Sequence, residues 1–371
     1  MNPQRAAKIL SFLTLILSLA ASVFAQTPTP PPAVDDDEVI RVESRLVVVP
    51  VSVTDASGQP VSGLKKEDFF IREERRAQEI AEISDAEKVP LEIVLLFDIS
   101  ATTNPMFQFQ LETAAKFLRE VMRPDDRATI FTVGESPVMI QERGTAGQAA
   151  SAIEKIQPTK QFTAFYDSVA AAAEYLQKNT PSGRRKVILT ISDGEDTNST
   201  RIAAAIQNGY RSLGSKIDTM DSKALYELTV KNRNEASIRE QNRVLKLLQN
   251  ADAVFYSINP AGSSYQLNKI SQIGQAAMQR FADETGGTGY LPKFQPIDLK
   301  DQYQNASNSR ANQEVLTRIF RQLANELQAQ YLVQYYSEGD FENGRYVNLE
   351  VGLRNPQSYK VRARRGYFVK K

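Results

Sequence analysis

The sequence predicts an α/β fold: a doubly wound, mainly parallel sheet that is inserted in or flanked by a small β-sandwich formed by the N- and C-terminal segments. Three observations lead to this prediction. Apolar strand-like runs alternate with helical patterns through the middle of the chain. The run "LEIVLLF" (91–97) is apolar along nearly its whole length, as a central parallel strand covered on both faces requires. The two ends of the chain instead carry β-rich runs joined by turn signals.

The first 25 residues have the pattern of a secretory signal peptide. Arg5 and Lys8 precede an apolar core over 9–19, and small residues up to Ala25 suit cleavage. An uncleaved membrane anchor is the alternative reading, although the apolar stretch is short for a span of about 20 residues. Residues 26–37 are Pro-rich and then acidic, which is typical of an extended linker. We therefore expect an exported protein (periplasmic, in the cell envelope or secreted) that has no stable membrane insertion after signal cleavage.

Residues 38–86 are expected to form an N-terminal β unit. Residues 46–54 read as one strand, "DASGQP" as a turn, and "DFFIRE" (68–73) as a second strand. Pro50 within the first run favours an edge position or a bulge.

Residues 88–329 are expected to form the α/β domain. Its strand-like runs lie at 91–97, 128–133, 137–142, 186–191, 253–258 and 288–291, and its helical patterns at 107–122, 147–156, 164–178, 267–285 and 312–329. Residues 199–250 contain no strand-like run and are longer than one connecting helix requires, so this segment contains a helical insertion. It is either a solvated embellishment or a cover and partner contact beside the site described below.

The tail, 330–371, returns to β structure. "QYLVQYYSEG", "GRYVNLEVGL" and "YKVRARRGYFV" are separated by two turn signals and predict a three-strand meander. Because so small a sheet is marginal alone, we expect it to pack on the N-terminal β unit.

The composition excludes several functional classes. Lys plus Arg number 45 and Asp plus Glu 44, so the chain has no net field that would attract nucleic acid. The absence of histidine excludes Ser-His-Asp and Cys-His catalysis and His-ligated zinc, and the absence of cysteine excludes disulfides and thiol chemistry. A metal ion must therefore be held by oxygen, which favours Mg²⁺, Mn²⁺ or Ca²⁺.

Three polar motifs lie where such an ion could bind. Asp98, Ser100 and Thr102 follow the strand 91–97 in a D-x-S-x-T spacing, Thr163 precedes a helix, and Asp193 follows the strand 186–191. Ligands of doubly wound sheets bind at the carboxyl ends of the strands. Two aspartates and three hydroxyls match the oxygen coordination of Mg²⁺ and leave one position open.

Local roles are the alternatives for the same residues. Ser100 and Thr102 are also typical helix N-caps, and Asp193 with Gly194 is also a turn sequence. Asp167 is expected to cap or orient the helix at 164–178 rather than to bind metal. Glu195 and Asp196 lie beside the motif without being assigned as ligands.

Together "DISAT", "TAFYD" and "ISDGEDT" resemble the metal-ion-dependent adhesion site of von Willebrand factor type A (VWA) domains. The resemblance assigns Asp98, Ser100, Thr102, Thr163 and Asp193 to the metal, with Thr102 standing where the family usually has Ser. A narrower resemblance, carried by "VPVSVTDASGQPVSGLKKEDFFIREE", "FADETGG" and "VRARRGYF" as well, is to the exported bacterial VWFA-related domain proteins of acidobacterial type.

The VWA resemblance implies a non-enzymatic binding or adhesion module. Its divalent cation, Mg²⁺ above Mn²⁺ or Ca²⁺, would bind an Asp or Glu side chain of a protein partner. One alternative is a structural or assembly scaffold with a degenerate, empty site. A metal-dependent hydrolase is a weaker alternative, because the sequence offers no general base with a helper.

Overall fold

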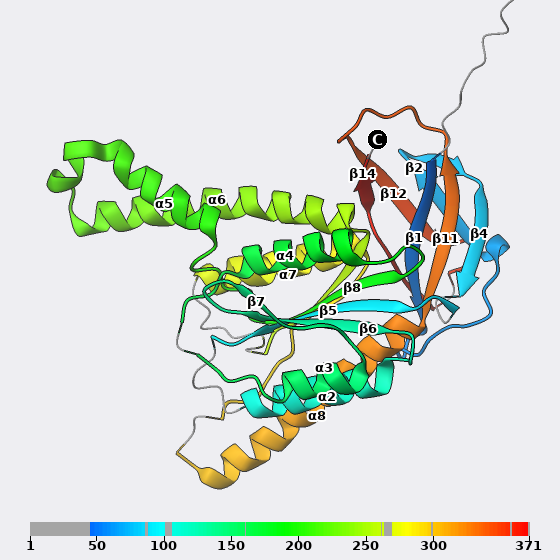
Figure 1. Ribbon diagram of the computed structural model, residues 1–371, viewed down its shortest axis with the longest axis horizontal. Coiled ribbons are helices and arrows are strands. Elements are labelled where there is room, and N and C mark those ends of the chain that lie inside the picture. The colour runs from blue at the N-terminus through cyan, green and yellow to red at the C-terminus, as the bar shows by residue number, and fades with distance from the viewer. Residues whose placement is uncertain are drawn as a thin grey trace, which may run out of the picture. The chain divides into compact units, whose positions relative to one another are not determined.

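A computed structural model describes residues 45–85, 88–100, 106–159, 161–260, 262, 269–297, 300–356 and 358–369 (Figure 1). The predicted signal peptide (1–25) and linker (26–37) lie outside these residues, as does Thr102. Within the described part of the chain, no helix combines the length and the apolarity that are needed to cross a membrane.

A six-stranded sheet forms the centre of the α/β part. Its strands are β5 (Leu91–Asp98), β6 (Arg127–Val133), β7 (Pro137–Gly144), β8 (Arg185–Ile191), β9 (Ala253–Ile258) and β10 (Gly289–Tyr290). They run in the order β10-β9-β8-β5-β6-β7, and all pairs are parallel except β6–β7. Every residue of β5 is buried, as its apolar sequence predicts. The structure therefore confirms the predicted fold class.

Helices cover both faces of this sheet (Figure 1). One face packs against α2 (Phe107–Val121), α3 (Ala146–Ile153) and α8 (Gln302–Gln328), and the other against α4 (Phe165–Asn179), α6 (Ser222–Asn250) and α7 (Lys269–Thr285). Helix α8 begins ten residues before the predicted start at 312, where the sequence has no apolar period.

Residues 200–250 form a helical arm. It comprises α5 (Thr200–Leu213), the short helix η3 (Gly214–Thr219) and α6. In Figure 1 the arm extends away from the sheet, and only the later part of α6 lies over it. The burial of the side chains is consistent with this position, since Ile202 is the one buried residue of α5 and the buried residues of α6 begin at Ala236.

The two ends of the chain build a β-sandwich. One sheet has the order β13-β1-β11-β4 and the other β14-β12-β2-β3. The strands are β1 (Arg45–Thr54), β2 (Phe69–Glu73), β3 (Arg76–Gln78), β4 (Ile80–Asp85), β11 (Gln330–Ser337), β12 (Tyr346–Leu353), β13 (Lys360–Ala363) and β14 (Gly366–Phe368). Alternate residues of β1, from Val47 to Val53, face the shared core with Tyr335 and Val347.

The tail is not the predicted three-strand meander. Strand β11 pairs with β1 and β4, whereas β12 belongs to the opposite sheet and pairs with β2 and β14. The run "YKVRARRGYFV" is divided between β13 and β14, which lie in different sheets. Each tail strand except β14 thus pairs with an N-terminal strand, because the two ends share one apolar core.

Candidate metal centre

The sheet places the two predicted aspartates side by side. Asp98 is the last residue of β5, and Asp193 lies two residues beyond the end of β8. These strands are parallel neighbours, with Phe97 opposite Ile191. Strand β5 also pairs with β6 on its other side, so this edge is the point from which the chain winds in both directions.

Hydroxyl and backbone donors surround the Asp98 carboxylate, which is 7% exposed. Its Oδ1 accepts from the Ser100 N–H at 2.9 Å and from the Ser100 hydroxyl at 2.7 Å. Its Oδ2 accepts from the Ser192 hydroxyl at 2.6 Å. Burial raises the pKa of Asp98 and outweighs the opposite effect of the hydrogen bonds from Ser192 and Ser100.

Asp193 lies close enough to Asp98 for the two carboxylates to interact electrostatically. Its Oδ1 accepts from the Glu195 N–H at 2.9 Å. Burial, followed by the neighbouring Asp98 charge, raises the pKa of Asp193 to about 7. Among the described residues, neither aspartate forms an ion pair with a Lys or Arg. The pair therefore holds negative charge in a partly desolvated place without a basic partner.

Thr163 is fixed by its backbone and keeps its hydroxyl available. Its N–H donates to the Thr197 hydroxyl at 2.9 Å, and its carbonyl accepts from the N–H groups of Thr197 and Asn198 at 2.9 Å. No hydrogen bond joins the buried Thr163 hydroxyl to any residue that the structure describes. The segment before α4 that carries Thr163 also contacts the residue after Asp98: the Thr159 N–H donates to the Ile99 carbonyl at 2.6 Å.

The oxygen atoms of these side chains are suitable ligands for a hard cation when the hydroxyl groups are included. Within the described ranges, no three His, Cys, Asp or Glu side chains gather as a metal cluster. A divalent ion would therefore take Asp98 and Asp193 together with neutral oxygens from Ser100 and Thr163. Such an ion would neutralise the two carboxylates and polarise a ligand at an open position.

Sequence reasoning missed Ser192, whose buried hydroxyl orients Asp98 and accepts from the Gly194 N–H at 3.0 Å. The only signal was its place between a buried strand and Asp193. Sequence reasoning also assigned Asp167 to the wrong helix. Asp167 lies in the first turn of α4, but its Oδ2 caps α5 by accepting from the Thr200 N–H and hydroxyl, both at 2.8 Å.

Asp196 is the residue that caps α4. Its Oδ2 accepts from the Tyr166 N–H at 2.9 Å and also contacts the Ser199 hydroxyl, while its Oδ1 accepts from the Ser199 N–H at 3.0 Å. Burial raises the pKa of Asp196, and the hydrogen bond from Ser199 opposes this rise. The loop that carries Asp193 is thus tied to the first turns of both α4 and α5.

The comparisons with known proteins identify this domain. Residues 93–195, which include both aspartates and Thr163, match the family model of the von Willebrand factor type A domain. No curated protein matches the chain.

Several solved structures match the chain at low sequence identity. An aerotolerance-related membrane protein from Bacteroides fragilis is 17% identical (61% of this chain and 98% of that chain covered, TM-score 0.32). Proximal thread matrix protein 1 from the mussel byssus, described with a zinc-occupied MIDAS motif, is 12% identical (69% and 50%, TM-score 0.38). The manganese-loaded TRAP protein of Plasmodium vivax is 10% identical (77% and 82%, TM-score 0.32). All three TM-scores are low, so the assignment depends on the family-model match: the chain contains a von Willebrand factor type A domain.

Proposed function

We propose that the protein is an exported, non-enzymatic binding module that uses a divalent cation to engage a carboxylate of a protein partner. The ligands would be Asp98, Ser100, Thr102, Thr163 and Asp193, and Mg²⁺ is the favoured ion. One observation carries the proposal. Burial raises the pKa of two neighbouring aspartates at the switch point of the sheet, the charge of Asp98 raises the pKa of Asp193 further, and no basic side chain of the described residues pairs with them.

The donor set supports a role in capture rather than in catalysis. Three of the five ligands are neutral hydroxyls, so a bound cation would keep enough positive charge to attract an external Asp or Glu. The VWA resemblance implies the same mode of binding. The chain has no histidine to serve as a general base, which makes a metal-dependent hydrolase the weaker candidate.

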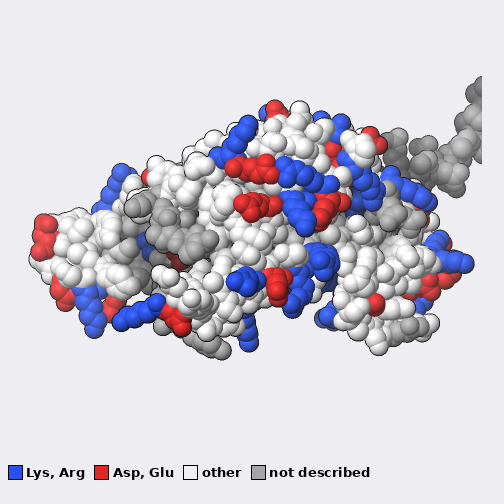
Figure 2. Space-filling view, turned by 90° about the horizontal axis from the view of Figure 1, so that it is seen from below, with Lys and Arg blue, Asp and Glu red and all other residues white. Residues whose placement is uncertain are grey.

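The partner is proposed to be a protein and not a nucleic acid. The formal net charge of the chain is +1. On the face that Figure 2 shows, Lys and Arg alternate with Asp and Glu, without a broad basic patch.

We also propose that the chain is divided into a signal peptide (1–25), a linker (26–37), an N-terminal β unit (38–86), a VWA-like domain (88–329) and a C-terminal β segment (330–371).

Thermal unfolding tests the cation site. Mg²⁺ or Mn²⁺ at 100 times its Kd should stabilise the folded protein by about 2.7 kcal/mol and raise its Tm. Asp98→Asn and Asp193→Asn keep the side-chain shape and should abolish the rise. Asp221→Asn, a change at the cap of α6 within the arm, should retain it. A wild-type Tm that does not respond to saturating cation would favour the scaffold with an empty site.

Capture experiments test the partner. A pull-down from cell-envelope extract should recover the partner with Mg²⁺ and lose it with chelator or with Asp98→Asn. Substituting the acidic residues of the recovered partner one at a time should identify the carboxylate that reaches the ion. Equal recovery by wild type and Asp98→Asn would contradict the proposed mode of binding.

A further inference from the structure

A cleft lies at the opposite end of the central sheet from the aspartates. Its volume is about 550 Å³, within the range of small-molecule sites. One wall is formed by the first half of β1, by β11 and by the end of β14. The other wall is the connection from α4 to β8, residues 180–184, with the amino end of β8.

The sandwich wall of this cleft is apolar. Leu46 and Val48 lie on the side of β1 away from the sandwich core, and they are 48% and 37% exposed. Leu332 of β11 and Phe368 of β14 line the same cleft. Exposed apolar side chains that are grouped in a concavity, rather than scattered, are typical of a ligand wall.

Basic side chains dominate the polar part of the lining. Arg45, Arg184, Arg185, Lys186 and Arg364 line the cleft, whereas Asp252 is the single Asp or Glu among its described lining residues. Two of these arginines bind acceptors of the protein itself. Arg184 pairs with Glu92 at 2.8 Å, and Arg185 donates to the Leu327 carbonyl and the Gln330 side chain, both at 2.9 Å.

Arg364 and Arg45 keep unused donors. The Arg364 side chain is 8% exposed; its Nη1 binds Asp252 at 2.9 Å and its Nη2 donates to the Val48 carbonyl at 3.0 Å. Its buried Nε has no partner within the described structure. The buried Nη1 of Arg45 has none either, and no ion pair or hydrogen bond joins the Arg45 side chain to the described residues. Both Arg45 and Arg364 line the cleft.

We propose that this cleft binds an organic anion, a carboxylate or phosphate attached to an apolar body. The anionic group would accept from Arg45 and Arg364, and the apolar body would cover Leu46 and Val48. A buried guanidinium donor without an acceptor costs free energy, which charge-assisted hydrogen bonds to an anion would recover. The planar donors of arginine match carboxylate and phosphate oxygens.

Titration calorimetry on the full chain tests the site. The probes are n-octyl phosphate, n-octyl glucoside as a neutral molecule of equal chain length, and inorganic phosphate. The measurements are made with chelator so that the metal centre does not contribute. We expect n-octyl phosphate to bind, inorganic phosphate to bind at least about tenfold more weakly and the glucoside to bind without saturation. Equal binding of the glucoside and the phosphate, or no binding of n-octyl phosphate, would overturn the proposal.

Two variants locate the binding. Arg45→Gln removes a guanidinium that forms no hydrogen bond or ion pair with the described residues, so the fold should persist while the Kd of n-octyl phosphate rises about tenfold or more. Arg211→Gln changes an exposed arginine on α5 and should leave the Kd unchanged. An unchanged Kd in Arg45→Gln would rule out the site.

A vesicle experiment then distinguishes the source of the anion. Co-sedimentation with phosphatidylglycerol vesicles that Arg45→Gln abolishes would indicate a lipid headgroup. Soluble binding of n-octyl phosphate without co-sedimentation would indicate a free organic anion, and both results support the proposed chemistry.

Discussion

At the scale of the residue, the metal centre is built from two carboxylates and short hydroxyl side chains. Ser100 and Ser192 occupy both oxygens of Asp98, whereas Asp193 accepts one backbone hydrogen bond from Glu195. Neither arrangement supplies a positive charge. The metal-free protein therefore has to bury ionised carboxylates or to keep them protonated.

The raised pKa of Asp193 predicts that the stability of the metal-free protein depends on pH. The pKa of Asp193 is raised from 3.8 to about 7. Between these values the folded state holds a proton on Asp193 that the unfolded state has released. The contribution of this group to stability is therefore fully present below about pH 4 and is lost as the pH rises through about 7. With chelator present, the Tm of the wild type should fall more steeply over this range than the Tm of Asp193→Asn. Saturating Mg²⁺ should reduce the fall, and parallel profiles of wild type and variant would contradict this reading.

Glycine at 274 is required by close contact of α7 with the metal-site loop. A Cβ on Gly274 would lie 2.2 Å from the Gly194 carbonyl oxygen, and Gly194 itself has a φ of +78°. Gly274→Ala must displace backbone, so we expect it to cost about 1–3 kcal/mol of stability and to weaken cation binding. Gly147→Ala, in α3 with open space around the new Cβ, should instead be neutral or stabilise by up to about 1 kcal/mol. Urea denaturation with and without Mg²⁺ measures both effects.

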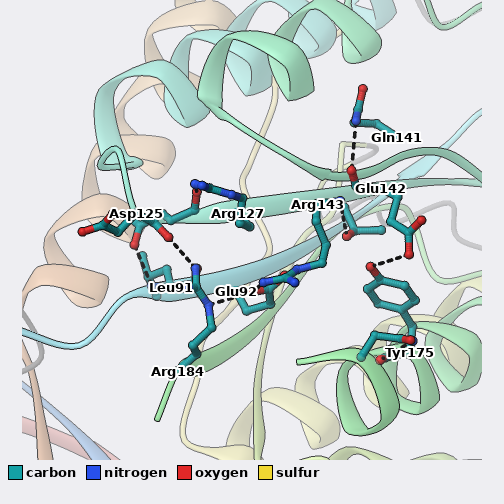
Figure 3. A network of polar contacts seen from close by, with 12 residues as sticks. Leu91, Glu92, Asp125, Arg127, Gln141, Glu142, Arg143, Tyr175 and Arg184 are labelled. Carbon is teal, nitrogen blue, oxygen red and sulfur yellow. Dashed lines mark hydrogen bonds and ion pairs between the residues drawn. The ribbon is translucent and has the colours of Figure 1, made fainter. Parts of the chain in front are cut away.

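At the scale of the element, an ion cluster holds the amino ends of the sheet strands together (Figure 3). Glu92 of β5 is 1% exposed and accepts from Arg143 of β7 at 2.9 and 3.2 Å. Arg184, just before β8, pairs with Oε2 of the same carboxylate at 2.8 Å and donates to the Leu91 and Asp125 carbonyls. Three segments of the sheet thus depend on one carboxylate.

Removing that charge should destabilise the sheet strongly. Glu92→Gln leaves Arg143 and Arg184 without their anion, and breaking a buried pair in this way costs about 3–5 kcal/mol. Glu350→Gln, which breaks the exposed pair of Glu350 with Arg72, should cost less than about 1 kcal/mol. Equal urea midpoints for the two variants would show that the cluster contributes little.

Sequence patterns located the central strands well and the polar elements poorly. The predicted run 253–258 matches β9, and 91–97 falls one residue short of β5, because buried strands are apolar throughout. The first ten residues of α8 and the short strands β3 and β4 lack such a signal. In the metal centre the sequence indicated the strand ends that carry the two aspartates, but not Ser192, whose role depends on a contact across 94 residues.

At the scale of the whole molecule, each sandwich sheet takes strands from both ends of the chain. Strand β11 lies between β1 and β4, so Val333 is opposite Val49 on one side and Ile83 on the other. Turn signals predicted the tail strands but could not specify these partners, because pairing across 278 to 292 residues is set by the shared core and not by the turns.

A substitution in β11 that disrupts this core should therefore also unfold β1. Val333→Asp places a carboxylate in the sandwich core, where Val333 is 0% exposed, and should cost about 4 kcal/mol or more. Tyr336→Asp, on the outward and 52% exposed side of the same strand, should cost less than about 1 kcal/mol. Because β1 has its longest pairing with β11, limited proteolysis of Val333→Asp should cleave within residues 45–54, whereas Tyr336→Asp should resist as the wild type does. Cleavage of Val333→Asp confined to the tail would mean that the N-terminal strands keep their fold without β11.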